Sequence, residues 1–316
     1  MMGDGIETGF IKKLGINGVS ELEPFSYKLL DNAKEGITKP QYIQFGNITA
    51  FKKDSRFTDE SDDMELVINW IGRKLGISMA ETYRFLSINQ EPTALISVNV
   101  ATTSNKTFFS MEKVREQIIA AVKEGTLPYE SWMKRYTDLL EQKAYPSVEE
   151  AFESSVNSEN EAREIIEVGE RFIDIISTAQ TNRILLKRKY RQMIFLDALV
   201  GQVDRTLGNY GLIYDEIEHQ YSFAPLFDNA TLRKPYTGFG ICLVNGFVAE
   251  RKYVLKILLE DKKILSMAKL LIENKFQIIP SLLKIAAEWL EPKQYDLLIS
   301  NFFFGLFVLE ALIIKK

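Results

Sequence analysis

A chain of 316 residues is long enough to bury a large hydrophobic core and to form about two domains or lobes. Its formal net charge of −4 gives no electrostatic reason to expect nucleic acid as the main partner. The single cysteine, Cys242, excludes an intramolecular disulfide and a cysteine metal cluster, and the single histidine, His219, argues against a histidine-based zinc site or catalytic triad. These features fit a protein of the reducing cytosol, so we expect a cytoplasmic location.

The sequence predicts neither a signal peptide nor a membrane span. No basic segment followed by an apolar run occurs near the N-terminus. The most apolar stretch, residues 302–314, has 13 residues, whereas about 20 are needed to cross a bilayer. We therefore expect this stretch to form a buried C-terminal helix.

Short runs of β-branched and aromatic residues predict that the first hundred residues are rich in strands. These candidate strands cover residues 42–45, 48–52, 82–88 and 93–100. Gly46-Asn47 between the first two is a tight hairpin signal. Between the two pairs of strands, residues 64–75 carry apolar side chains at helical spacing and end at Gly76.

The rest of the chain is dominated by amphipathic helical patterns. The candidate helices cover residues 110–124, 131–142, 159–178, 181–199 and, with boundaries at Pro280 and Pro292, residues 249–316. A hairpin candidate at residues 212–214 and 221–223 interrupts them. This order of elements predicts an α+β protein with a β-rich part over residues 1–104 and a mainly helical part over residues 105–316.

One polar loop combines residue types that suit phosphoryl transfer. It follows the predicted end of a helix near Gly201 and presents Asp204 and, five residues later, Asn209. A carboxylate can take the proton of an acceptor hydroxyl, and an amide oxygen can ligate Mg²⁺. Asp228, after the second strand of the hairpin, would add the charged ligand that this hard cation prefers.

Spacing alone does not distinguish this pair, because Asp296 and Asn301 repeat it inside an apolar helical pattern. The surrounding order of helix, loop, strand, polar turn, strand and second aspartate is what favours a catalytic role for Asp204. The alternative interpretation is a loop whose backbone is capped by Asp and Asn side chains.

Two segments of the chain resemble the catalytic and metal-binding motifs of the HipA-like serine/threonine kinases: DRTLGNYG at residues 204–211 and APLFD at residues 224–228. The resemblance is strong over residues 190–232 and rests elsewhere on the order of elements. It implies a two-lobed protein-kinase-like fold with a β-rich N-lobe and a mainly helical C-lobe. It also implies ATP and Mg²⁺ as cofactors and phosphorylation of Ser or Thr in a protein substrate. Thr206 stands where the family has histidine, a departure that allows for weakened activity.

Within this resemblance, a lysine on a strand of the first part should reach the ATP phosphates. Ala50 and Lys52 lie two residues apart and share a strand face, so Lys52 is the candidate and Lys53, on the opposite face, is the alternative. Glu65, near the start of the following helix, is the expected partner of Lys52. Three other acidic residues compete for that role: Glu60, Asp62 and Asp63. A solvent-facing lysine and an acid favoured by a helix N-terminus are the structural alternatives.

The remaining nucleotide contacts are assigned by position only. Residues 32–39 are the candidate phosphate-covering loop, although one glycine, Gly36, is also what an ordinary surface turn contains. The hinge that contacts adenine is expected at residues 98–101, where we select Val100.

Three functions remain open from the sequence. The first is a Ser/Thr protein kinase, with autophosphorylation among its reactions. The second is a small-molecule or lipid phosphotransferase, which shares the spacing of Asp204 and Asn209. The third is a pseudokinase that keeps the fold as a docking surface for an antitoxin-like partner.

Overall fold

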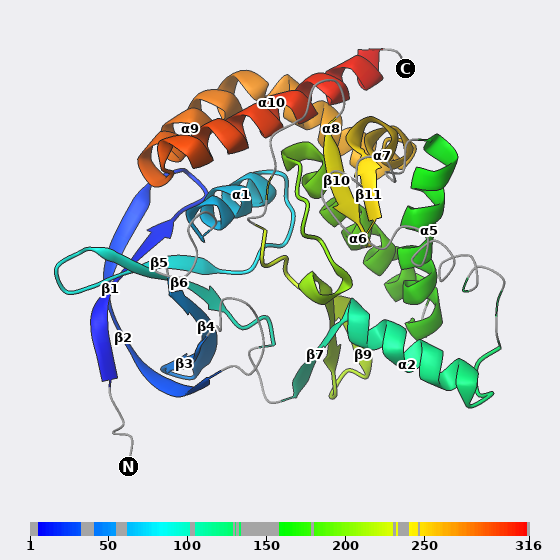
Figure 1. Ribbon diagram of the computed structural model, residues 1–316, viewed down its shortest axis with the longest axis horizontal. Helices are drawn as coiled ribbons and strands as arrows, with labels where there is room; N and C mark the ends of the chain where they lie inside the picture. Colours follow the sequence, from blue (N-terminus) through cyan, green and yellow to red (C-terminus); the bar gives the residue numbers. More distant parts are fainter. Residues whose placement is uncertain are drawn as a thin grey trace. The chain divides into compact units, whose positions relative to one another are not determined.

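The computed structural model describes residues 6–32, 41–54, 62–101, 105–128, 130, 133, 158–177, 180–229, 232, 240–245 and 247–314. The chain divides into two compact units, each of which is built from separate stretches of sequence (Figure 1). The first unit contains Met1–Ser104, Pro225–Ala230 and Gln277–Asp296, and the second contains Asn105–Ala224, Thr231–Phe276 and Leu297–Lys316.

A closed antiparallel barrel forms the body of the first unit. Its strands are β1 (Ile6–Leu14), β2 (Ser20–Asn32), β3 (Gln41–Phe45), β4 (Ile48–Asp54), β5 (Thr82–Leu86) and β6 (Pro92–Val98), in the order β1-β2-β3-β4-β6-β5. Alternate side chains point inward and form the barrel core: Ile11, Phe25, Tyr27, Ile43, Ala50, Phe85, Ala94 and Ile96. The hairpin predicted at Gly46-Asn47 is present, with Phe45 paired to Ile48.

The long β1–β2 hairpin was not predicted, because charged residues interrupt its apolar alternation. In the structure these charges make contacts of their own, such as the ion pair of 2.7 Å between Lys13 and Glu23. Closure of the barrel between β1 and β5 depends on Gly9, where a Cβ atom would lie 2.2 Å from the backbone oxygen of Leu86.

Helix α1 (Asp62–Lys74) belongs to the same unit and confirms the predicted helix. Its apolar face, including Leu66, Val67 and Trp70, is fully buried. The helix ends before Gly76, which has the left-handed backbone (φ +72°) that commonly terminates helices. The first unit also includes most of α9 (Lys275–Trp289), which contains Pro280 rather than ending there as predicted.

Most of the helices are in the second unit. They are α2 (Met111–Lys123), α5 (Glu159–Ile176), α6 (Gln180–Val200), the 3₁₀ turn η2 (Leu207–Asn209), α7 (Arg251–Leu258), α8 (Lys262–Glu273) and most of α10 (Pro292–Ile314). The predicted helix over residues 131–142 lies almost entirely outside the described residues.

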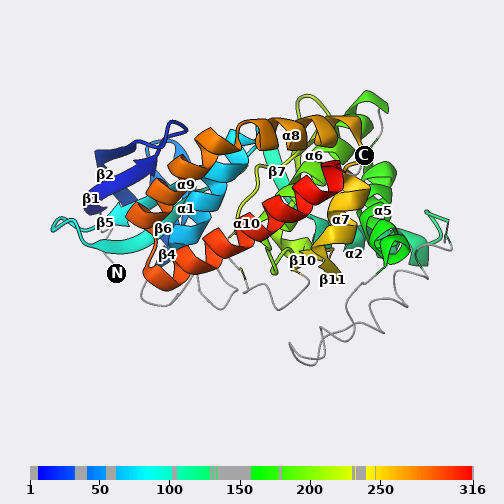
Figure 2. The same cartoon turned by 90° about the horizontal axis from the view of Figure 1, so that it is seen from above.

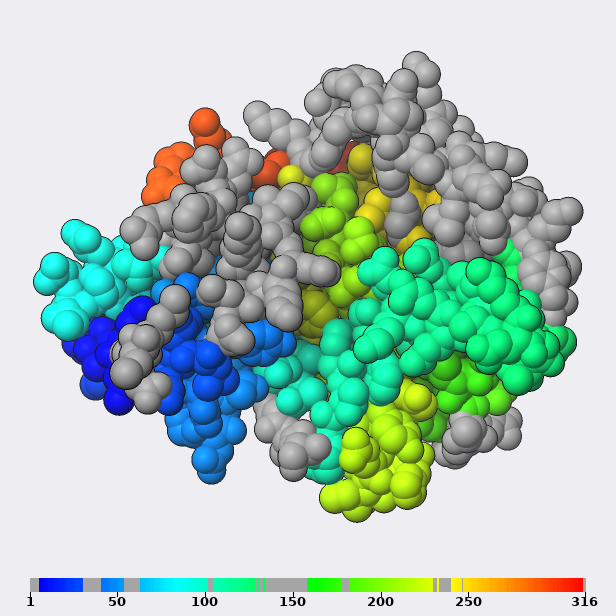
Figure 3. All heavy atoms as spheres, turned by 60° about the horizontal axis from the view of Figure 1, so that its bottom comes forward, coloured from blue at the N-terminus to red at the C-terminus, as the bar shows by residue number. Residues whose placement is uncertain are grey.

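Two small sheets accompany these helices. The predicted hairpin is present as β8 (Gly211–Asp215) and β9 (Gln220–Phe223), and an unpredicted strand, β7 (Lys106–Ser110), pairs with β8. The exposed turn of this hairpin, which carries His219, forms part of the surface in Figure 3. A second hairpin, β10 (Ile241–Val244) and β11 (Phe247–Glu250), was also not predicted. It buries Cys242, and this burial raises the pKa of the thiol to about 12, as expected for a core cysteine rather than a nucleophile.

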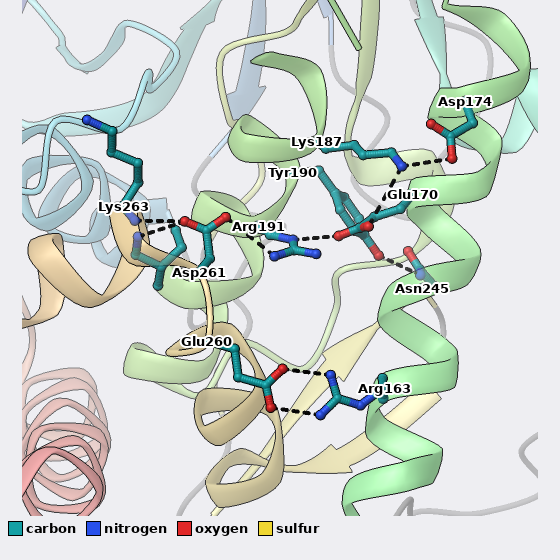
Figure 4. Close-up of polar contacts among 11 residues, drawn as sticks. Arg163, Glu170, Asp174, Lys187, Tyr190, Arg191, Asn245, Glu260, Asp261 and Lys263 are labelled. Atoms are coloured by element: carbon teal, nitrogen blue, oxygen red, sulfur yellow. Dashed lines mark hydrogen bonds and ion pairs between the residues drawn. The ribbon is translucent and has the colours of Figure 1, made fainter. Parts of the chain in front are cut away.

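Ion pairs join the helices of the second unit along one side (Figure 4). Arg191 of α6 contacts Glu170 of α5 at 2.5 Å and Asp261, the N-cap of α8, at 3.4 Å. Arg163 of α5 makes a two-pronged contact with Glu260 at 2.7 and 2.8 Å. Exposed pairs such as Arg163–Glu260 contribute about 0–1 kcal/mol each, whereas Glu170 is buried where it meets Arg191.

Helix α10 begins at Pro292, well before the apolar stretch that predicted it. One face is buried through Leu298, Phe302 and Leu309, whereas Phe307 and Ile314 are exposed, so the expectation of a buried helix holds for one face only. Among the described residues it is the one helix that is long and apolar enough to cross a membrane. The core helix of a soluble protein meets the same criteria, and one such helix is weak evidence for a membrane span.

A buried arginine, Arg251, holds α10 against the end of α6, and α10 passes beside α7 (Figure 2). Its guanidinium donates to the backbone oxygens of Ala198 and Leu199 and, at 2.8 Å, of Asn301. Close approach at this crossing requires Gly305, because a Cβ atom there would lie 2.1 Å from the oxygen of Leu199.

We therefore expect Gly305→Ala to lower the free energy of unfolding by about 1–3 kcal/mol, because the added methyl overpacks the crossing. Urea denaturation followed by circular dichroism measures the effect. The control is Ser300→Ala on the exposed side of the same helix, which should change stability by less than about 0.5 kcal/mol. Equal stability of the two variants would show that the crossing tolerates a methyl.

Candidate functional site

The loop that carries Asp204 starts from a well-defined helix end. The backbone N–H groups of Gly201 and Gln202 donate to the oxygen of Asp197 at 2.8 and 3.0 Å, and Gly201 has φ +74°. The chain thus leaves α6 in a fixed direction before entering the loop.

A buried ion pair ties this loop back to α6. Arg205 donates from Nε and Nη2 to the two carboxylate oxygens of Asp197, each at 3.0 Å. Its Nη1 atom donates to the backbone oxygen of Asn209 at 2.8 Å. Burial raises the pKa of Asp197, and the facing guanidinium opposes that rise. Arg205 therefore clamps the loop at both ends of the Asp204–Asn209 segment.

The side chain of Asn209 bonds across the same segment to the backbone of Asp204. Its Nδ2 atom donates to the backbone oxygen of Asp204 at 2.6 Å, so the amide oxygen is the atom suited to a metal. The side chain of Asp204 is half-buried. Thr206 is exposed and makes no side-chain cap at η2, so the side-chain bonds described in this loop come from Arg205 and Asn209 rather than from Thr206.

A second cluster lies within the first unit and brings together Lys53, Glu65 and Asp228. Lys53 Nζ is 2.8 Å from Asp228 Oδ1 and 3.6 Å from Glu65 Oε2. The backbone N–H of Asp228 donates to Glu65 Oε1 at 3.0 Å. Glu65 is 1% exposed, whereas Asp228 is 42% exposed. A buried carboxylate thus anchors a lysine and the backbone of an accessible aspartate.

The segment that carries Asp228 forms an isolated parallel bridge, Met79 to Leu226, with the segment that precedes β5. Leu226 exchanges backbone hydrogen bonds with Ser78 and Ala80 at 2.9 and 2.8 Å. Asp228 itself has φ +55°, a left-handed conformation that non-glycine residues adopt rarely. Such conformations are concentrated at functional sites, because the surrounding contacts must enforce them.

Sequence reasoning missed Asn69 and Asn229. Asn229 Nδ2 donates to Asn69 Oδ1 at 2.8 Å, and Asn69 Nδ2 donates to Thr82 Oγ1 at 3.0 Å. Asn69 follows Glu65 by four residues, so both face the same side of α1. That spacing, with two adjacent polar residues at 228–229, is the signal that could have identified them.

The structure places Lys53, rather than Lys52, against Glu65. Lys52 and Ala50 do share a face, as expected, but that face is the barrel interior. Lys52 Nζ lies 3.6 Å from Glu7 Oε2 and 5.5 Å from the ring centroid of Tyr27. Neighbouring strand residues point to opposite sides, so Lys53 points toward α1 and is the better candidate for a phosphate-binding lysine.

The other predicted positions are placed as follows. Val100 is half-buried in the bend after β6, and its role as a hinge residue stays a prediction. The candidate loop at 32–39 lies outside the described residues except for its first residue, as does Glu60, and nothing is described of the Asp62 side chain. Asp63 pairs with Arg84 instead of Lys52. Asn301 is buried and accepts from Arg251 at 3.1 Å, in agreement with its structural interpretation.

The residues suit Mg²⁺ in their chemistry. Mg²⁺ is commonly held by one or two carboxylates together with substrate phosphates and water, and Asp228 and the Asn209 amide supply oxygen ligands of the right kind. Among the described residues, no group of three or more His, Cys, Asp or Glu side chains could hold a metal, which argues against an all-protein metal cage there.

The contribution of the buried Asp197–Arg205 pair to stability can be tested. Replacing Asp197 by Asn leaves the Arg205 charge buried without its counter-ion, and we expect a loss of about 3–5 kcal/mol in unfolding free energy. Urea denaturation measures it, with Arg163→Ala at an exposed pair as the matched control, expected to cost about 1 kcal/mol or less. Similar losses in both variants would mean that the Arg205 clamp adds nothing beyond a surface pair.

No protein-family model matches this sequence, and no curated protein matches it. Among solved structures, the chain is similar to the crystal structure of the Helicobacter pylori proinflammatory kinase CtkA, with a TM-score of 0.57 and 14% sequence identity. The similarity covers 92% of this chain and 96% of that chain. At this identity the finding concerns the fold: the chain is a mixed α/β protein with a kinase-like structural neighbour.

Proposed function

We propose that this chain is an ATP- and Mg²⁺-dependent serine/threonine protein kinase with a two-lobed fold, active in the cytoplasm. The observation that carries the proposal is the cluster of Lys53, Glu65 and Asp228. A lysine paired with a helix glutamate, together with a metal-binding aspartate, is the arrangement that positions ATP in protein kinases. The kinase-like neighbour over nearly the whole chain supports the same interpretation.

Each residue has a separate role in this proposal. Lys53 would bind the phosphates with its charge held by Glu65, and Asp228 and Asn209 would ligate Mg²⁺. Asp204 would orient the acceptor hydroxyl and accept its proton. Bound Mg²⁺ would neutralise the phosphate charge that develops during transfer.

Lys53 Nζ lies 2.8 Å from Asp228 Oδ1, so the ammonium group neutralises a carboxylate that stands beside Glu65. Both charged groups then remain close to the positions from which they would act on ATP and metal.

Substituting the two neighbouring lysines tests the proposal. We expect Lys53→Met to lower phosphate transfer by at least about 100-fold, because an electrostatic contact to the phosphates is lost. Lys52→Met should have a far smaller effect, since its side chain lies in the barrel. Transfer from labelled ATP to the chain itself and to an added protein substrate measures both, with circular dichroism to confirm folding.

The position of the label distinguishes the alternatives. Label on small molecules or lipids alone would replace the proposal with a small-molecule or lipid phosphotransferase. ATP binding without transfer in the parent chain would indicate a pseudokinase. For that case we propose that the chain is a docking surface for an antitoxin-like partner. Loss of transfer in folded Lys52→Met but not in Lys53→Met would overturn the assignment of Lys53.

Metal dependence can be tested through stability. ATP with Mg²⁺ at about 100 times its Kd should stabilise the folded chain by about 2.7 kcal/mol, seen as a rise in Tm. Asp228→Asn keeps the backbone donor to Glu65 and tolerates positive φ, but loses the charged ligand. In that variant we expect the extra stabilisation by Mg²⁺ over ATP alone to disappear. A full Mg²⁺ effect in Asp228→Asn would remove Asp228 from the metal site.

A further inference from the structure

Arg84 of β5 grips the first turn of α1. Its Nε donates to Asp63 Oδ1 at 2.7 Å, and its Nη2 lies 2.6 Å from Asp63 Oδ2. This is the two-pronged geometry that makes arginine–carboxylate pairs both strong and directional. Asp63 precedes Glu65 by two residues, so the contact is made in the turn of helix that carries the lysine's partner.

The same guanidinium also holds the end of α9 within the first unit. Nη2 donates to the backbone oxygen of Trp289 at 2.6 Å, and the group lies 4.6 Å from the centroid of the Trp289 ring. Trp289 is the last residue of α9, so its carbonyl has no partner within the helix. A cation at this end also interacts favourably with the helix dipole.

The end of α9 is itself fixed to the barrel. Glu288 accepts from Lys12 Nζ at 2.9 Å and from Ser20 Oγ at 2.8 Å. Lys12 Nζ lies 4.4 Å from the centroid of the Trp289 ring, which is almost completely buried. Arg84 therefore connects α1 to the end of α9, which is itself bonded to the barrel strands β1 and β2.

Different contacts secure the second half of α1. Trp70 Nε1 donates to the backbone oxygen of Ile16 at 3.1 Å, and Arg73 Nη2 donates to that of Leu14 at 3.3 Å. Both bonds reach the β1–β2 hairpin from the C-terminal turns. The two halves of the helix are thus held by separate sets of residues.

Helix geometry explains why Asp63 matters for Glu65. Successive residues are about 100° apart around an α-helix, so side chains two residues apart leave it about 200° apart. Arg84 and the Lys53–Asp228 side therefore hold the first turn from nearly opposite directions. Together these contacts fix the rotation of the first turn about the helix axis. The distance of 3.6 Å between Lys53 Nζ and Glu65 Oε2 depends on that rotation.

We infer that Arg84 is a positioning residue that holds the first turn of α1 against the end of α9 and thereby keeps Glu65 beside Lys53. The consequence for nucleotide binding rests on the proposed function, whereas the mechanical link does not. Lysine cannot replace arginine here, because one ammonium group cannot reproduce a two-pronged contact with Asp63 and a bond to the Trp289 carbonyl.

Hydrogen exchange in the 316-residue chain tests the mechanical link. In Arg84→Lys we expect the amides of residues 64–68 to exchange at least about tenfold faster, while residues 70–74 change less. Arg73→Ala, which removes a guanidinium–carbonyl bond from the other half of α1, should show the reverse pattern. Asp63→Asn breaks the same contact from the other side and should reproduce the effect of Arg84→Lys. Unchanged exchange at residues 64–68 in both Arg84→Lys and Asp63→Asn would overturn the inference.

Nucleotide binding tests the route through Lys53. By calorimetry with ATP and Mg²⁺, Arg84→Lys should weaken binding several-fold in the parent chain but add no further loss in a Lys53→Met background. The same fold loss in both backgrounds would show that Arg84 acts elsewhere and would refute the route. A parent chain that binds no ATP would refute the proposed function and the nucleotide consequence, and the exchange pattern would still decide the mechanical link.

Discussion

The first unit is organised around one buried carboxylate, that of Glu65. An ionised carboxylate with almost no exposed surface is strongly unfavourable unless it is paired and hydrogen-bonded. Glu65 meets this requirement with two elements that are distant in sequence: the Lys53 ammonium from β4 and the backbone N–H of Asp228. These partners must stay in place for the buried charge to be tolerated. The Glu65 carboxylate therefore links α1, β4 and the segment around Asp228.

The second unit also contains a buried carboxylate, that of Asp197, which is paired with Arg205. Asp197 and Arg205 are both buried, and their mutual contact lets a charged side chain on α6 define the course of a polar loop. The loop that carries Asp204 is also anchored by Leu207, which is 6% exposed. The helix end and the satisfied buried pair together fix the backbone of this loop.

The identity of 14% to a kinase of similar fold shows how little sequence such a framework requires. The barrel core needs only apolar residues of suitable size at alternating positions, and many sequences satisfy that condition. Polar positions are less exchangeable, because each buried donor or acceptor needs a specific partner. Asn69 and Asn229 illustrate this: each is nearly fully buried, and each bonds the other.

The sequence by itself determined the local features of this protein. Hydrophobic period and turn residues correctly placed α1, the hairpin at Gly46-Asn47 and the β8–β9 hairpin, because these depend on contacts between near neighbours. Motif context also set aside Asn301, which proved to be a buried structural residue, whereas the selection of Asp228 as a metal ligand stays a prediction. Tertiary structure alone decided which of Lys52 and Lys53 lies beside Glu65, because both strand faces carried a lysine and only barrel closure determined which face turned inward. Barrel closure, like the contact between Arg84 and the end of α9, joins residues far apart in the chain, and no local pattern encodes it.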